Sequence, residues 1–242
     1  MGLGTVGAVG LAAGGCAYAA MFPGSRVFGP TLTAPPRPDE LALTFDDGPN
    51  PAWTPRLLDL LAAHGVHATF FIVGRFAQAE PALVRRVAEE GHLIGNHSWS
   101  HPNLARTPAN RVVEELKQTS GMLEQVVGKS VQYFRPPFGA RRPFVLRTAR
   151  ALGMIPVTWN AMTNDWVEPS ADRIAEKLKV KIELNWGKGQ ASNIVLHDGG
   201  HRGLGANRGP SVTAAGQLLA SYNATRRFVT LDAWASAPLR AK

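Results

Sequence analysis

Short apolar runs alternate with longer amphipathic stretches along most of the chain. The runs have the length and composition of β-strands and read LALTF, ATFFIV, HLIGNH, VQYFRPP, MIPVTW, SNIVLHD and RFVTL. The stretches between them have helical length and periodicity, at residues 53–64, 80–91, 108–127, 143–152, 170–184 and 211–225. Because helices of this size connect parallel strands, the pattern predicts an α/β fold with seven parallel strands.

Polar residues capable of chemistry follow five different strands of this prediction, and they are Asp46, His97, Arg135, Asp165 and His197. In a (β/α) barrel, the carboxyl ends of all strands meet at one face, so these side chains would converge. An open doubly wound sheet is the alternative. We therefore predict an incomplete or distorted (β/α) barrel.

The first 40 residues differ in composition from the rest of the chain. Residues 2–22 are uncharged and about long enough to cross a bilayer, although rich in Gly and Ala, and Arg26 follows them closely. We expect residues 1–22 to form an N-terminal anchor or signal segment, 23–40 a Pro/Gly-rich linker and 41–242 one catalytic domain. This predicts an extracytoplasmic protein of the cell envelope, membrane-anchored or secreted. A cytoplasmic protein with a mis-started N-terminus is the alternative.

Charge and cysteine content narrow the range of ligands. The chain carries a formal charge of +8, but its basic residues are scattered and no basic stretch has interleaved aromatic residues, so we expect no nucleic-acid partner. Cys16 is the single cysteine, which excludes an intrachain disulfide and a cysteine-rich zinc site. Any metal ion must therefore be bound by histidine and carboxylate.

Two short motifs supply such groups. His97 and His101 stand four residues apart in NHSWSHP, a spacing that predicts two imidazoles on one side of a helical turn. Asp46 and Asp47 are adjacent in TFDDGP, where one could bind metal while the other handles protons. Taken alone, the histidine motif would also fit a pair of surface histidines, and the aspartate motif would also fit an ordinary polar turn. Together they form an Asp-His-His set suited to an open zinc site.

Three further motifs carry polar or aromatic groups after strands. FRPPFG contributes Arg135 and the backbone N–H of Phe138, which could donate to an oxyanion. TNDW contributes Asp165, able to orient a histidine, beside Trp166, and LHDGG places His197 before a glycine turn. Each also fits a purely structural role, so none decides the function by itself.

In sequence order, TFDDGP, HSWSH, RPPFG, NDW and LHDGG resemble the five motifs of the polysaccharide deacetylase family, carbohydrate esterase family 4, which shares the NodB homology domain. The resemblance extends over residues 41–232 and includes ATFFIVGR and GHLIGNHS. It implies a distorted (β/α) barrel with seven strands. It also implies that Asp46 is the general base, that Asp47, His97 and His101 hold a divalent metal, and that His197 is the general acid.

The same resemblance assigns supporting roles. Arg135 would steady Asp46, Asp165 would orient and tune His197, and the Phe138 N–H would share the oxyanion with the metal. Trp166 and Val195 would form the pocket for the acetyl methyl group. Three positions depart from the family pattern: Met162 stands where an additional aspartate is common, Val195 replaces a leucine, and Phe138 replaces a frequent tyrosine.

The residues and the resemblance together predict a hydrolase that removes N-acetyl groups from N-acetylglucosamine-containing glycans by metal-activated water. Peptidoglycan, chitin-like oligomers or another envelope polysaccharide would be the substrate, zinc the metal with cobalt or manganese as alternatives, and the protein a monomer attached to a membrane through residues 2–22. One alternative is a catalytically silent sugar-binding envelope protein. Another is a deacylase of a lipid-linked sugar or of a non-sugar amide.

Overall fold

The computed structural model describes residues 20–235 of the 242-residue chain. The predicted anchor or signal segment at residues 1–22 therefore lies outside the described residues, apart from its last three positions. Between residues 20 and 235, none of the helices combines the length and the apolar character needed to cross a membrane.

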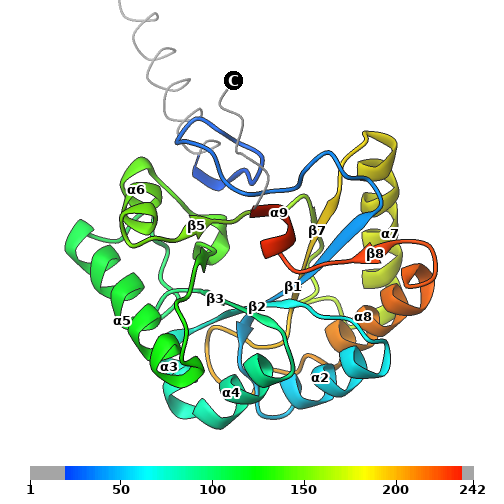
Figure 1. Cartoon of the computed structure of the whole chain (residues 1–242), viewed down its shortest axis with the longest axis horizontal. Helices are drawn as coiled ribbons and strands as arrows, with labels where there is room; N and C mark the ends of the chain where they lie inside the picture. Colours follow the sequence, from blue (N-terminus) through cyan, green and yellow to red (C-terminus); the bar gives the residue numbers. More distant parts are fainter. Residues whose placement is uncertain (1–19, 236–242) are drawn as a thin grey trace, which may run out of the picture.

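The strands form one parallel sheet that curls into a distorted barrel (Figure 1). They are β1 (Glu40–Gly48), β2 (Thr69–Ile72), β3 (Leu93–Asn96), β4 (Tyr133–Phe134), β5 (Ile155–Pro156), β6 (Ala161–Met162), β7 (Ser192–His197) and β8 (Arg227–Phe228). Seven of them pair in the order β5-β4-β3-β2-β1-β7-β6, and β8 pairs with β1 off this path. The predicted distorted barrel of parallel strands is confirmed. Seven of the eight strands coincide with the apolar runs, and β6 was not predicted.

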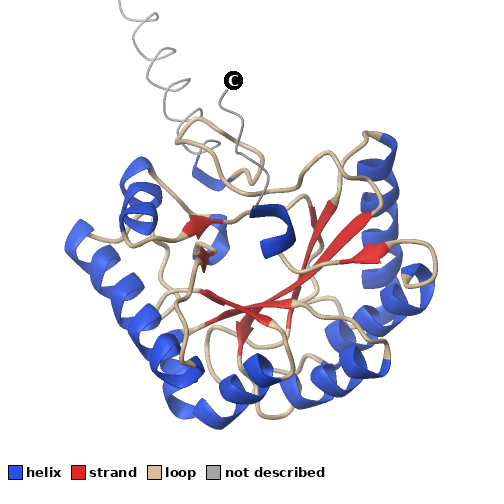
Figure 2. Cartoon of the chain, in the orientation of Figure 1, coloured by secondary structure: helices blue, strands red, loops and turns tan. Residues whose placement is uncertain are grey.

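Helices surround the sheet on its outer side in an arc (Figure 2). They are α2 (Thr54–Ala63), α3 (Gly74–Ala79), α4 (Pro81–Glu89), α5 (Ala109–Val127), α6 (Pro143–Ala151), α7 (Ala171–Gly187) and α8 (Gly209–Tyr222). The short helix α9 (Asp232–Ala235) lies inside this arc (Figure 1), and a 3-10 turn η1 (Pro137–Gly139) follows β4. Four of the longer helices begin with proline in their first turn, where its missing N–H costs no hydrogen bond. The six helices expected from periodicity are present, and α3 and α9 are additional.

Strand β1 shows how the sequence divides between the two faces of the sheet. Leu41, Leu43 and Phe45 pack in the core between sheet and helices. Ala42 points the other way, into a second core inside the barrel that Trp234 of α9 also enters. Because side chains alternate along a strand, Thr44 and Asp46 share the interior face with Ala42. The polar end of β1 therefore opens into the barrel, at the end opposite to α9.

The chain segment before β1 closes the gap between the two edge strands of the sheet. Leu32 forms a parallel bridge with Val157, and its N–H and carbonyl bond to Pro156 and Thr158 at 2.9 Å each. On the other side, the Asn193 side chain donates to the Thr33 carbonyl at 3.0 Å. In Figure 1 this blue segment crosses the opening in the helical arc between α6 and α7. Part of the range 23–40, expected as a linker, thus lies in the barrel wall.

Candidate active site

Two neighbouring strands of the sheet, β1 and β7, bring together a carboxylate and an imidazole from distant parts of the chain. In the parallel pairing of β1 with β7, Asp46 lies directly opposite His197. Both residues stand at the carboxyl ends of their strands, where the polar residues of a barrel converge. The Asp46 side chain is buried, whereas 13% of the His197 side chain stays exposed.

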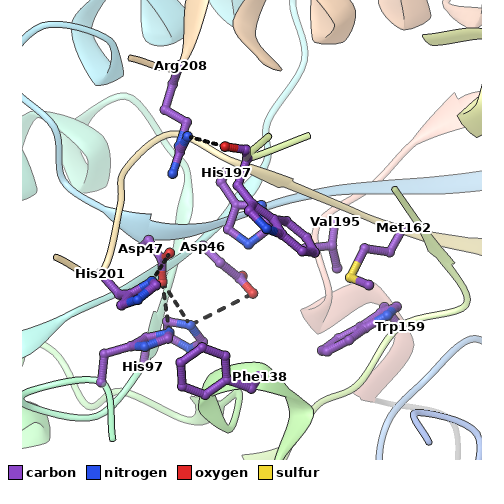
Figure 3. A pocket seen from close by; sticks show the side chains of 12 residues that line it. Asp46, Asp47, His97, Phe138, Trp159, Met162, Val195, His197, His201 and Arg208 are labelled. Atoms are coloured by element: carbon purple, nitrogen blue, oxygen red, sulfur yellow. Dashed lines mark hydrogen bonds and ion pairs between the residues drawn. The ribbon is translucent and has the colours of Figure 1, made fainter. Parts of the chain in front are cut away.

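Asp47, His97 and His101 form a buried cluster whose ligand atoms all lie within 4.8 Å of one another. Asp47 Oδ1 is 2.9 Å from His101 Nε2 and 3.4 Å from His97 Nε2, so both imidazoles present the same nitrogen to one carboxylate oxygen (Figure 3). That oxygen is buried and has no hydrogen-bond partner among the described residues. A buried carboxylate oxygen facing two imidazole nitrogens fits a divalent cation of the zinc, cobalt or manganese class.

The backbone of this cluster is strained. Asp47 and His101 have φ values of 70° and 61°, in the left-handed region that residues with a side chain rarely adopt. Such conformations cost of order 1–3 kcal/mol each and are concentrated at functional sites. Two of the three candidate ligands are therefore held in place by the surrounding structure at the expense of stability.

The predicted helical turn at residues 97–101 is wrong, because this segment is a loop that follows β3. The Asn96 side chain accepts a bond from the Ser98 N–H at 2.8 Å, and the Ser98 hydroxyl accepts one from the His101 N–H at 3.1 Å. Pro102 also disfavours a helical conformation for the residue before it. Side-chain hydrogen bonds to the backbone thus replace the helix and still bring the two imidazoles together.

Electrostatics in the cluster favour an ionised carboxylate. Burial acts to raise the pKa of Asp47, but the nearby imidazoles of His101, His201 and His97 outweigh it and hold that pKa well below the ordinary value. Burial, opposed by Asp47, lowers the pKa of His101. A charged carboxylate beside a neutral imidazole is the protonation state that metal binding requires.

Arg135 holds Asp46 in place. Its guanidinium donates 2.7 Å bonds to Asp46 Oδ1 and to the Thr44 hydroxyl, and a 3.2 Å bond to the Asn193 side chain. The Arg135 side chain is fully buried and lies 4.1 Å above the Phe71 ring. The second oxygen, Asp46 Oδ2, is 3.9 Å from His97 Nε2, so it faces the metal cluster.

Asp165 holds His197 from the other side. One Asp165 oxygen lies 2.8 Å from His197 Nδ1, and the other accepts bonds from the His197 N–H and the Ser211 hydroxyl. Burial acts to lower the pKa of His197, but the buried Asp165 carboxylate outweighs it and raises that pKa to about 9. His197 is therefore a cation at neutral pH.

These groups line one cavity of about 320 Å³. Its other lining residues are Phe138, Trp159, Met162, Trp166, Val195, His201 and Arg208. The structure thus brings all ten residues singled out in the sequence to one place, eight on the cavity wall and Arg135 and Asp165 behind it. The sequence reasoning missed Trp159, Ser211, Asn193 and His201. Only Asn193 gave a signal, since it is a polar residue in an otherwise apolar strand.

The profile of a known family, described as polysaccharide deacetylase, matches residues 33–157. The chain belongs to the polysaccharide deacetylase family. Among curated members, the peptidoglycan-N-acetylglucosamine deacetylase of Bacillus cereus is 36% identical over 193 residues, which cover 79% of this chain and 66% of that protein. The chitooligosaccharide deacetylase of Sinorhizobium fredii is 36% identical over 158 residues, covering 65% of this chain and 71% of that protein.

Solved structures of this family have the same fold. A peptidoglycan N-acetylglucosamine deacetylase in complex with 4-naphthalen-1-yl-N-oxidanyl-benzamide is 34% identical with a TM-score of 0.75, covering 84% of this chain and 91% of that one. A family 4 acetyl xylan esterase from Clostridium thermocellum in complex with a cobalt ion is 28% identical with a TM-score of 0.70, covering 80% and 89%. The predictions of the family, the fold and a hydrolase of linear amide bonds are confirmed.

Proposed function

We propose that this deacetylase removes N-acetyl groups from N-acetylglucosamine units of an envelope glycan, with a divalent metal held by Asp47, His97 and His101. One observation carries the proposal. A carboxylate and a protonated imidazole, Asp46 and His197, are register partners on neighbouring strands and flank this metal cluster over a single cavity. Amide hydrolysis needs a base for water, an electrophile for the carbonyl and an acid for the amine.

Asp46 is the group placed to accept a proton from the attacking water. Arg135 binds its Oδ1 and leaves Oδ2 directed at the cluster. The guanidinium also fixes the orientation of the carboxylate, because Thr44 and Asn193 hold the arginine in turn. A divalent ion, when bound, polarises the acetyl carbonyl and promotes ionisation of the water. Zinc is the ion we propose, with cobalt or manganese as alternatives.

His197 is the group placed to protonate the leaving amine. Its Nδ1 is engaged by Asp165, so Nε2 is the nitrogen that can deliver a proton into the cavity. The raised pKa of His197 keeps that proton available at neutral pH. The Trp166 ring packs edge-on against His197 at 5.2 Å and limits its rotation.

The remaining wall of the cavity suits an acetyl group. We assign the Phe138 N–H to the developing oxyanion and the apolar pocket of Trp166 and Val195 to the methyl group. Trp159 and Met162 extend the apolar lining. Met162 occupies the position where the family pattern has an additional aspartate, which makes this side of the pocket uncharged.

The relatives support a glycan substrate, since the curated matches are named for peptidoglycan and chitooligosaccharide. An extracytoplasmic place of action follows from such substrates, and attachment to a membrane through residues 2–22 and a monomeric state remain part of the proposal. A silent sugar-binding protein would not need Asp46 or His197, yet both are held in place by buried partners. A lipid-linked sugar or a non-sugar amide would change the substrate and leave these roles intact.

The test is acetate release from chitooligosaccharides and peptidoglycan, with and without added zinc. We expect zinc-dependent release that falls by at least about 100-fold in Asp46→Asn and in His101→Ala, because each change removes a group that acts in the transition state. His67→Ala, at an exposed position away from the cavity, is the matched control. Zinc-bound protein that releases acetate from neither substrate would contradict the proposal.

A further inference from the structure

The two candidate metal-binding histidines are supported in different ways. His97 Nδ1 lies 2.8 Å from the Arg135 carbonyl, the kind of second contact that fixes the ring of a metal-binding imidazole. His101 Nδ1 is buried and has no hydrogen-bond partner among the described residues. Apart from the 2.9 Å contact of its Nε2 with Asp47, the orientation of the His101 ring therefore depends on packing.

His201 supplies that packing. Its ring stacks on the His101 ring at a centroid distance of 4.8 Å and an interplanar angle of 16°. Phe138 meets the same His101 ring edge-on at 4.6 Å, so the imidazole is confined on two sides. The close-up shows His201 beside Asp47 at the edge of the cluster (Figure 3).

His201 also faces the second candidate ligand. Its Nδ1 lies 3.8 Å from Asp47 Oδ2, the second oxygen of that carboxylate. Asp47 Oδ1 is the oxygen directed at His97 and His101. One imidazole therefore contacts two of the three candidate ligands from the side of the cavity mouth.

The loop that carries His201 is itself fixed at several points. Arg75 of α3 donates a hydrogen bond to the His201 carbonyl, and Arg208 donates one to the Gly199 carbonyl at 2.5 Å. Gly199 lies so close to Asp47 that a Cβ atom there would be 2.0 Å from the Asp47 carbonyl oxygen. A residue held this firmly can orient its neighbours.

We infer that His201 is a positioning residue of the metal site, which stacks on His101 and directs Asp47 to bind metal through Oδ1. The inference rests on the proposed function, since it requires that Asp47, His97 and His101 hold a divalent ion. His201 is not itself assigned as a ligand, because its Nδ1 approaches the outer carboxylate oxygen. Changing an outer partner of a metal ligand typically weakens metal affinity 10- to 100-fold.

The test compares the full chain with His201→Ala, His201→Phe and the control Arg202→Ala, an exposed neighbour in the same loop. Dissociation constants for Zn²⁺ and Co²⁺ come from competition with a chelator, and the visible absorption of the Co²⁺ form reports the ligand geometry. We expect a 10- to 100-fold weaker affinity and an altered Co²⁺ spectrum in His201→Ala, with no change in Arg202→Ala. His201→Phe keeps a ring against His101 but lacks Nδ1, so we expect an affinity between those of wild type and His201→Ala.

Two negative outcomes can be told apart. Unchanged metal affinity and an unchanged spectrum in His201→Ala would overturn the inference while leaving the metal site intact. A change in the KM of His201→Ala with no change in metal affinity would also overturn the inference. It would indicate that His201 contacts the substrate. If the wild-type chain bound Zn²⁺ and Co²⁺ no better than Asp47→Asn does, this would overturn the inference. It would also overturn the metal site of the proposed function.

Discussion

Asp165 sets the charge of His197 through contacts that use both of its carboxylate oxygens. Burial alone would favour a neutral imidazole, since a charged group loses solvation inside the protein. The 2.8 Å contact with an ionised partner reverses that preference and places the pKa of His197 at about 9. The acid in the proposed reaction thus depends mainly on Asp165, with smaller contributions from Asp47 and Asp46.

The pH dependence of kcat should report the raised pKa of His197. His197 can donate a proton only below its pKa, so we expect acetate release to decline as pH rises through about 9. In Asp165→Asn the carboxylate charge is gone while burial remains, and the decline should move to lower pH. Ser211→Ala, which removes a hydroxyl bonded to Asp165 but keeps the charge, should shift it less. An alkaline limb at the same pH in wild type and Asp165→Asn would rule out this role.

A second titratable residue, His92, affects the stability of the fold and lies outside the active site. Burial, aided by His67, lowers the pKa of His92 to about 4, and His92 Nδ1 accepts a 3.1 Å bond from the Ala68 N–H. The neutral ring is therefore built into the fold. The unfolded chain binds this proton near pH 6.5 and the folded chain near pH 4, so stability is full above about 6.5 and is lost as pH falls toward 4.

We expect the free energy of unfolding to fall by about 2 kcal/mol between pH 7 and pH 5 because the unfolded chain binds a proton at His92. His92→Asn keeps an acceptor for the Ala68 N–H but cannot titrate, so its unfolding free energy should lose about 2 kcal/mol less than that of wild type over this range. Urea unfolding at several pH values measures the difference, with His64→Asn as the control. Parallel stability curves for wild type and His92→Asn would show that the ring is protonated in the folded protein.

At the same scale, the sequence predicted catalytic candidates better than their partners. Asp46, Asp47 and His197 could be recognised because their residue types and motif spacing are themselves the chemistry. Ser211 and His201 could not, since their roles depend on which loop packs against which, and spacing along the chain does not encode that. Ser211 and His201 were thus visible only in three dimensions, whereas Arg135 and Asp165 could be named from the family resemblance.

At the scale of elements, strands and helices with clear periodicity were predicted and short irregular pieces were not. β6 has two residues within the polar stretch NAMTND, so no apolar run marks it in the sequence. The loop after β3 was taken for a helical turn because an i, i+4 histidine pair fits a helix as well as it fits a loop. Side-chain bonds from Asn96 and Ser98 decide between the two, and these are not periodic features.

The segment before β1 gives a prediction at this scale. Leu32 is buried in the barrel wall, whereas Val27 in the same segment is 74% exposed. Leu32→Ala should therefore cost about 2–4 kcal/mol and lower the Tm by roughly 5–10 °C. Val27→Ala should leave the Tm almost unchanged. Thermal unfolding of the two variants measures the contrast, and equal Tm values would mean that this segment adds little to the barrel.

At the scale of the whole molecule, the barrel brings residues from separate strands to one metal-binding face, so metal binding should stabilise the entire fold. A ligand present at 100 times its Kd adds about 2.7 kcal/mol to a fold that binds it only when native. We expect saturating zinc to raise the Tm by roughly 5–10 °C in wild type and to have no effect in Asp47→Asn. Asp59→Asn, at an exposed position on α2, should respond like wild type. A zinc response retained in Asp47→Asn would locate the binding elsewhere.

The pairing of β1 with β7 also determines when the site is completed as the chain folds. Asp47 lies about 50 residues before His97 and His101 in the chain, but Asp46 and His197 are about 150 residues apart. Contacts between distant residues form late, because closing the long loop between them costs entropy. A ribosome must therefore release almost the entire barrel before base meets acid. During refolding, the metal cluster can assemble early, whereas hydrolysis begins only when β7 has paired with β1.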